Sequence, residues 1–177
     1  MTLYLDTETT GLSPPHDDLV EVALIDDHGE RLIDALCRPA ERWMRRGWPG
    51  AQAIHGITPA AVAHARPADA VRADVAELVV GEDLVIYNAH FDLGFFPLAT
   101  ALSTASTQCA MLAAQRFFAW YKWPKLIQAA AWISYDWDAA GIPAHRAAGD
   151  ALATRALWQH MRANGWAGGP YVQGPST

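Results

Sequence analysis

The chain opens with a short apolar, β-prone segment at residues 3–5, and the glycine and prolines of residues 11–15 then end the regular pattern. Side chains two positions apart on a strand point to the same face, so Asp6 and Glu8 place two carboxylates side by side at the end of this strand. Unpaired carboxylates this close repel one another, and a divalent cation with oxygen ligands relieves the repulsion. A solvated strand end or a turn cap is the alternative interpretation of the pair.

The order of the remaining elements predicts an α/β fold. Strands are expected over residues 19–25, 31–38, 83–87 and 107–110. Helices are expected over residues 59–65, 68–80, 90–102, 111–119, 125–133 and 146–164. Residues 39–53, interrupted by prolines and glycines, are expected to form a long loop. Three strands followed by alternating helices and strands predict a mixed sheet with helices on both faces.

The composition narrows the class of protein. Hydrophobic residues make up 51% and charged residues 18%, which indicates a globular chain, expected to form one domain over residues 1–165 with a flexible tail at 166–177. No apolar run reaches membrane-spanning length and no signal segment is evident, so a cytoplasmic protein with reduced Cys37 and Cys109 is expected. The net charge of −6 argues against a protein that coats nucleic acid, but it leaves a nucleic-acid enzyme open because metal sites concentrate acids.

Further polar residues lie where predicted strands meet helices. Asp92 follows the strand at 83–87 and falls in a first helical turn, where an acid also serves as a dipole partner without any chemistry. His145 and Asp150 begin the last helix, and side chains five positions apart on a regular helix point about 140° apart. The pair therefore converges only if His145 lies on the loop before the helix, which Pro143 favours; a surface histidine is the alternative.

These segments together resemble a known family, the DEDDh (DnaQ-like) 3′–5′ exonucleases, which include the proofreading epsilon subunit of bacterial replicative polymerase, ribonuclease T and oligoribonuclease. Three segments occur in the order of its exonuclease motifs: Asp6-x-Glu8-Thr9-Thr10-Gly11-Leu12, Asn88-Ala89-x-Phe91-Asp92 and His145-x-x-x-x-Asp150. A fourth segment, His55-Gly56-Ile57-Thr58, matches one found in many members between the first two motifs. The resemblance spans nearly the whole chain.

The resemblance implies a ribonuclease-H-like fold with two divalent metal ions, Mg²⁺ or Mn²⁺. By position in the motifs, Asp6, Glu8 and Asp150 match the direct metal ligands, and Asp92 matches the acid that holds the second ion. His145 matches the general base, and a histidine at this position indicates the DEDDh branch. The residue types suit this chemistry, because hard cations prefer carboxylates and a histidine accepts a proton near neutral pH.

The implied reaction removes 5′-mononucleotides from the 3′ ends of single-stranded nucleic acid, with DNA favoured and RNA trimming as the alternative. Thr9, Leu12, His55 and Phe91 are the expected substrate contacts, although Leu12 and Phe91 also suit core positions. A homodimer and a polymerase or repair partner are both left open.

Two segments rich in aromatic and basic residues have two interpretations each. Residues 42–48 have the composition of a single-strand grip, or of a solvated loop with tryptophan against the core. Residues 117–123 favour core packing together with a dimer or partner contact.

Two other classes of protein compete with the exonuclease. Asp6-Thr7-Glu8-Thr9-Thr10 weakly resembles the nucleophile motif of haloacid-dehalogenase-type phosphatases, but a glutamate replaces the second aspartate. A non-catalytic nucleic-acid-binding module that keeps the fold is the other alternative.

Overall fold

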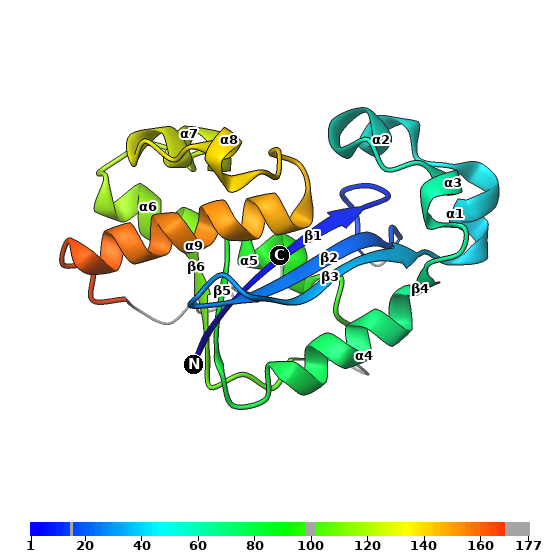
Figure 1. The fold of residues 1–177 in the computed structure, drawn as a ribbon, viewed down its shortest axis with the longest axis horizontal. Helices are drawn as coiled ribbons and strands as arrows, with labels where there is room; N and C mark the ends of the chain where they lie inside the picture. The colour runs from blue at the N-terminus through cyan, green and yellow to red at the C-terminus, as the bar shows by residue number, and fades with distance from the viewer. Residues whose placement is uncertain (15, 98–101, 169–177) are drawn as a thin grey trace.

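A computed structural model describes residues 1–14, 16–97 and 102–168 (Figure 1). Within these residues, six strands form one mixed sheet in the order β4-β3-β2-β1-β5-β6. The strands are β1 (Thr2–Thr9), β2 (Leu19–Asp26), β3 (Arg31–Arg38), β4 (Arg66–Pro67), β5 (Asp83–Ile86) and β6 (Ser106–Cys109). The β1–β2 and β2–β3 pairs are antiparallel, whereas β1–β5, β5–β6 and β3–β4 are parallel. The predicted mixed α/β sheet is confirmed.

Strand β1 lies in the interior of the sheet, and its alternating side chains serve two separate cores. Leu3 and Leu5 pack into the core beneath α4 (Ala68–Leu78), and Tyr4 packs into the core beneath α9 (Ala147–Ala163). Because side chains alternate along a strand, Asp6 and Glu8 share the α9 face with Tyr4. The sheet thus carries both carboxylates toward α9, which lies along one side of it in Figure 1, while α4 lies on the other.

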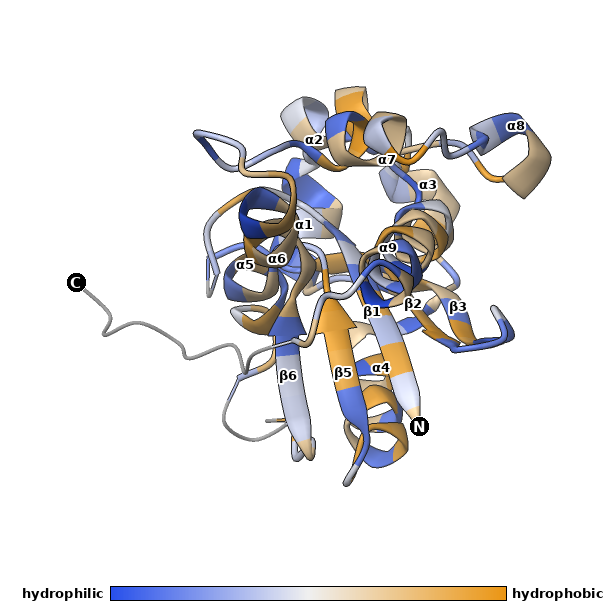
Figure 2. Ribbon diagram, turned by 90° about the vertical axis from the view of Figure 1, so that its left-hand side faces the viewer, coloured by the Kyte–Doolittle hydropathy of each residue, from blue (hydrophilic) through white to orange (hydrophobic). Residues whose placement is uncertain are grey.

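The remaining helices cover the two faces of this sheet. Helices α6 (Ala110–Phe117) and α7 (Leu126–Trp132) contribute to the α9 core, while α5 (Ala89–Leu93) contributes to the α4 core. Strand β5, paired on both sides, is buried from its second residue onward, and Figure 2 shows its apolar half directed toward the helices. Helices on both faces agree with the prediction. In the described ranges no helix is long and apolar enough to cross a membrane.

The predicted long loop over residues 39–53 is wrong, because this segment forms helices α1 (Glu41–Arg46) and α2 (Pro49–His55). Gly47 and Pro49 mark helix ends. Gly47 follows α1 with φ +69°, and Pro49 occupies the first turn of α2, where a missing N–H is tolerated. A third, smaller core of Val20, Trp48, Ile57 and Val62 holds these helices and α3 (Pro59–Val62) against the sheet.

The helix predicted over residues 90–102 is much shorter in the structure. Helix α5 ends at Leu93, and the four residues at 98–101 lie outside the described ranges. A side-chain carbon on Gly94 would lie 2.6 Å from Pro14, so this glycine permits close packing against the first turn of the chain. Pro97 then disfavours a helical backbone at Phe96. The short α8 (Trp137–Ala140) and the two-residue β4 were not predicted.

The structure describes the first three residues of the predicted tail, 166–168. Trp166 packs against the α9 core, and Arg162 Nη1 donates to the Ala167 carbonyl oxygen at 2.9 Å. Residues 169–177 lie outside the described ranges, so the domain boundary stays a prediction. Cys37 and Cys109 are both buried and free, as expected.

Candidate active site

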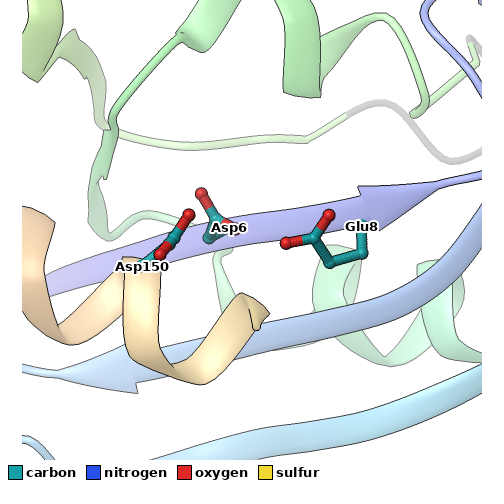
Figure 3. A group of neighbouring side chains, drawn as sticks. All are labelled: Asp6, Glu8 and Asp150. Carbon is teal, nitrogen blue, oxygen red and sulfur yellow. The ribbon is translucent and has the colours of Figure 1, made fainter. Parts of the chain in front are cut away.

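Three predicted metal ligands converge where β1 meets the first turn of α9. Asp6, Glu8 and Asp150 each offer a carboxylate oxygen, and these oxygens all lie within 4.8 Å of one another (Figure 3). Asp6 and Glu8 come from one face of β1, and Asp150 reaches them from the helix. Residues 144 positions apart in sequence are thus brought into one group of acids.

Small residues let the first turn of α9 approach the sheet and the preceding loop. Ala147, Ala148 and Gly149 are buried there. A side-chain carbon on Gly149 would lie 2.4 Å from the Pro143 carbonyl oxygen, so only glycine fits without a shift of the loop. The position of Asp150 therefore depends on the absence of a side chain at the preceding residue.

The three clustered carboxylates of Asp6, Glu8 and Asp150 favour the binding of protons or cations. Burial, followed by the negative charge of Asp150, raises the pKa of Asp6 well above its usual value and that of Glu8 to about 8. Burial raises the pKa of Asp150 to about 6, although the His145 N–H opposes the rise. Three clustered carboxylates with raised pKa values form an oxygen donor set suited to a hard divalent cation such as Mg²⁺ or Mn²⁺. The residues present therefore fit a metal site.

Asp92, the fourth predicted ligand, lies close to this group but outside it. Its side chain is buried, and Oδ1 accepts a hydrogen bond from Thr7 Oγ1 at 2.7 Å. Burial raises the pKa of Asp92 to about 7 against the effect of the Thr7 hydroxyl, and its charge in turn raises the pKa of Asp6. The structure thus brings Asp92 near Asp6 without placing it among the three converging carboxylates.

His145 lies on the loop before α9, as its convergence with Asp150 required. Its backbone N–H donates to Asp150 Oδ1 at 3.1 Å, and its φ of +62° is unusual for a residue with a side chain. The residue is exposed and lines a groove together with Ala144 and Arg146. His145 therefore has solvent access beside the carboxylates, which a proton acceptor for water requires.

A cavity of about 530 Å³ adjoins the carboxylates, and Glu8 lines it. All four predicted substrate contacts lie on its wall: Thr9, Leu12, His55 and Phe91. Leu12 is 83% exposed, so the alternative of a core contact is wrong for this residue. Phe91 has both a packing role and a place on the cavity wall. Its ring packs edge-on against Phe95, with the ring centres 5.1 Å apart, and it also lines the cavity.

His55 holds the turn after β1 in place. Its Nδ1 accepts a hydrogen bond from the Ile57 N–H at 3.0 Å, which leaves Nε2 as the protonated nitrogen facing the Thr9 carbonyl oxygen at 3.2 Å. Burial lowers the pKa of His55, in keeping with a neutral ring. His55 thus lines the cavity through a ring whose two nitrogens are both engaged with the backbone.

The two aromatic segments divide between core and surface. In the first, Trp48 is buried and donates to the Ile57 carbonyl oxygen at 2.8 Å, whereas Trp43 and Arg46 line the cavity with Arg46 5.4 Å from the Trp43 ring centre. In the second, core packing holds for Phe117 and Phe118, which pack against the α9 core. Tyr121 and Trp123 are instead 76% and 67% exposed.

Sequence reasoning missed Glu21, which is directly opposite Glu8 on β2 and almost fully buried. Its carboxylate pairs with Arg146 and accepts the Ala147 N–H at 2.9 Å. An isolated acid within an apolar strand was the available signal, since a buried charge requires a partner. The cavity residues Trp43 and Arg46 were noted only by composition, because their helix was not predicted.

Comparison with known proteins identifies the family of this chain. Residues 3–157 match the RNase_T exonuclease family, to which this chain belongs. An uncharacterized exonuclease, CP81, of Escherichia phage 186 is 31% identical over 169 residues, covering 86% of this chain and 83% of the relative.

Solved structures agree with this assignment. Exonuclease X in complex with 5′ overhanging duplex DNA superposes with a TM-score of 0.71 at 28% identity, covering 93% of this chain and 92% of the other. An E. coli exonuclease I–single-stranded DNA complex shares the fold with a TM-score of 0.67 at 23% identity, and 40% of its chain is covered. The expected ribonuclease-H-like fold and the expected nuclease activity are confirmed, and the phosphatase interpretation of Asp6 is wrong.

Proposed function

We propose that this exonuclease removes 5′-mononucleotides from the 3′ ends of single-stranded DNA in a metal-dependent reaction of the DEDDh type. The observation that carries the proposal is that the acid cluster adjoins the apolar cavity. Glu8 belongs to the converging carboxylates and also lines the cavity. A terminal nucleotide seated in the cavity has its phosphodiester beside the acids. The DNA-bound exonuclease X and exonuclease I structures support DNA as the substrate.

Asp6, Glu8 and Asp150 would hold the divalent ions, with Asp92 supporting the second one. When bound, two such ions stabilise negative charge on the scissile phosphate and favour ionisation of the attacking water. The four carboxylates must be ionised to act as ligands, and their raised pKa values show that each is protonated readily while no cation is present.

His145 is assigned the proton transfer. Its imidazole accepts a proton from the water whose oxygen attacks phosphorus, and the bond from phosphorus to the 3′-oxygen of the penultimate nucleotide breaks. The terminal nucleotide then leaves with the phosphate on its 5′-oxygen, and the 3′-oxygen of the shortened strand takes a proton from solvent water and becomes a 3′-hydroxyl. The exposed loop position of His145 allows exchange of the proton with solvent after each cycle.

The cavity wall recognises the terminal nucleotide by shape and stacking. A volume of about 530 Å³ falls in the range of small-ligand sites, which suits one nucleoside. The exposed side chain of Leu12 and the ring of Phe91 offer apolar contact to a base, and Thr9 lines the same space. None of these groups distinguishes one base from another, so the enzyme is expected to act on strands of any sequence.

Product analysis tests this proposal. Unlabelled single-stranded DNA is incubated with Mg²⁺ or Mn²⁺, and the products are separated by chromatography. Release of 5′-mononucleotides supports the proposal, whereas 3′-mononucleotides or internal fragments contradict it. A matched RNA strand decides between DNA and the alternative of RNA trimming, since only the 2′-hydroxyl differs along the sugar.

A further inference from the structure

Glu21 is a buried acid beside the candidate site that the proposed chemistry does not use. It stands opposite Glu8 in the β1–β2 register, and only 3% of its side chain is exposed. An ionised carboxylate in such a position is strongly unfavourable unless it is paired and hydrogen-bonded. The residues that pair with the Glu21 carboxylate therefore indicate which segment Glu21 holds in position.

The partners of Glu21 are two consecutive residues at the start of α9. Arg146 Nε lies 3.1 Å from each oxygen of the Glu21 carboxylate, and Arg146 Nη2 also donates to Oε1. The Ala147 backbone N–H donates to Oε2 at 2.9 Å. Several donors converging on one carboxylate fix its orientation as well as its position. A residue of the central sheet thus holds the backbone immediately after His145.

The backbone at His145 needs such support. Its φ of +62° lies in the left-handed region, which is unfavourable for any residue with a side chain unless the surroundings enforce it. On one side, the His145 N–H is bound to Asp150 Oδ1. On the other side, Arg146 and Ala147 are bound to Glu21. The turn that carries the imidazole is therefore fastened at both ends.

We propose that Glu21 and Arg146 form a clamp that positions His145 for proton transfer, which makes Glu21 a positioning residue and not a metal ligand. This inference rests on the role assigned to His145 in the proposed function. The clamp acts through the backbone turn of residues 144–147, and the cavity that receives the terminal nucleotide lies outside it.

The choice of variant follows from the charges. Arg146→Gln would leave Glu21 as an unpaired acid opposite Glu8, which adds a second disturbance to the loss of the clamp. Glu21→Gln avoids this, because the amide keeps the size of the side chain and one acceptor for the Ala147 N–H. Arg146→Lys is the second variant, because it keeps the positive charge and loses the two-pronged geometry.

A double-mutant cycle between Glu21 and His145 tests the proposal. His145→Ala is expected to lower kcat by about 10²-fold or more, the range of general-base catalysis. Glu21→Gln is expected to lower kcat about tenfold with KM within about twofold of the parent, because a displaced catalytic group slows the chemical step while the binding cavity is intact. In the His145→Ala background, Glu21→Gln is expected to change kcat by less than about twofold. Arg146→Lys should behave like Glu21→Gln in both backgrounds.

Arg155→Gln is the matched control on the same helix. Arg155 Nε donates to the Asp27 carbonyl oxygen at 2.8 Å, away from the His145 turn, so its loss is expected to lower the melting temperature and leave kcat unchanged. Equal losses of kcat from Glu21→Gln with and without His145 would overturn the clamp, and so would full activity of Glu21→Gln. Full activity of His145→Ala alone would instead overturn the base assignment in the proposed function, and the clamp with it.

Discussion

The raised pKa values of the clustered carboxylates predict how the stability of the protein changes with pH when divalent ions are removed with EDTA. The pKa of Glu8 rises from 4.5 in the unfolded chain to about 8 in the folded protein. For an acid with a raised folded pKa, the folded state binds more protons, so the contribution to stability is complete below 4.5 and is lost as the pH rises through 8. The chelated protein is therefore expected to be more stable at about pH 5 than at about pH 9.

The size of this effect follows from the same values. At about 1.4 kcal/mol per pH unit, the interval between 4.5 and about 8 corresponds to about 5 kcal/mol. The pKa values of Asp6, Asp92 and Asp150 are also raised, and these groups titrate together with Glu8, so the value for one carboxyl group serves as the total for the cluster. For a domain of this size, a loss of about 5 kcal/mol lowers the melting temperature by about 10–20 °C.

Thermal unfolding in EDTA across this pH range measures the effect, and a second series contains saturating Mg²⁺ or Mn²⁺. The ion is expected to restore most of the stability at high pH, since it binds the folded state only. Asp6→Asn should weaken both the pH dependence and the response to the ion, whereas Asp74→Asn, at an exposed ion pair with Arg66, should keep both. Equal or greater stability of the chelated protein at about pH 9 would refute the electrostatic reasoning.

Two further predictions concern substrate binding and packing. Leu12→Ala is expected to raise KM for single-stranded DNA about three- to tenfold without loss of stability, because Leu12 is 83% exposed and lines the cavity. The control is Val80→Ala, which should leave KM unchanged, because Val80 is 60% exposed and does not line the cavity. Gly149→Ala is expected to lower the free energy of unfolding by about 1–3 kcal/mol, because the new methyl group meets the Pro143 carbonyl oxygen. Gly50→Ala, where no described atom lies within 4 Å of the new carbon and the glycine lies in helix α2, should keep or slightly raise the free energy of unfolding in urea.

The sequence alone predicted the sheet and most of the acidic site for clear physical reasons. Alternating apolar residues define β1 and β2 locally, and the i, i+2 spacing of Asp6 and Glu8 places both on one face. The grouping of Asp150 with them was implied by the resemblance to the exonuclease family, and the structure brings the three carboxylates together. The strands and the shared face of Asp6 and Glu8 could be predicted because they depend on neighbours within a few residues.

The features that were missed depend on contacts between distant residues. Gly47 and Pro49 were interpreted as breaks in a loop, but the third core holds short helices on either side of them. Glu21 was overlooked because its partner Arg146 is 125 residues away in the sequence. The role of Asp92 as a ligand stays a prediction, since its carboxylate is bound to Thr7 and lies outside the converging group.

Digestion of 5′-labelled single-stranded DNA tests the central claim most directly, with Asp6→Asn as the control and Mg²⁺ or Mn²⁺ as the cofactor. A ladder of labelled products that shortens one nucleotide at a time from the 3′ end, requires the ion and is absent with Asp6→Asn is the expected result. Release of the label as a 5′-mononucleotide at the earliest times would show attack from the opposite end. That result, or an unchanged ladder with Asp6→Asn, would contradict the assignment of the carboxylate group as a 3′-end exonuclease site.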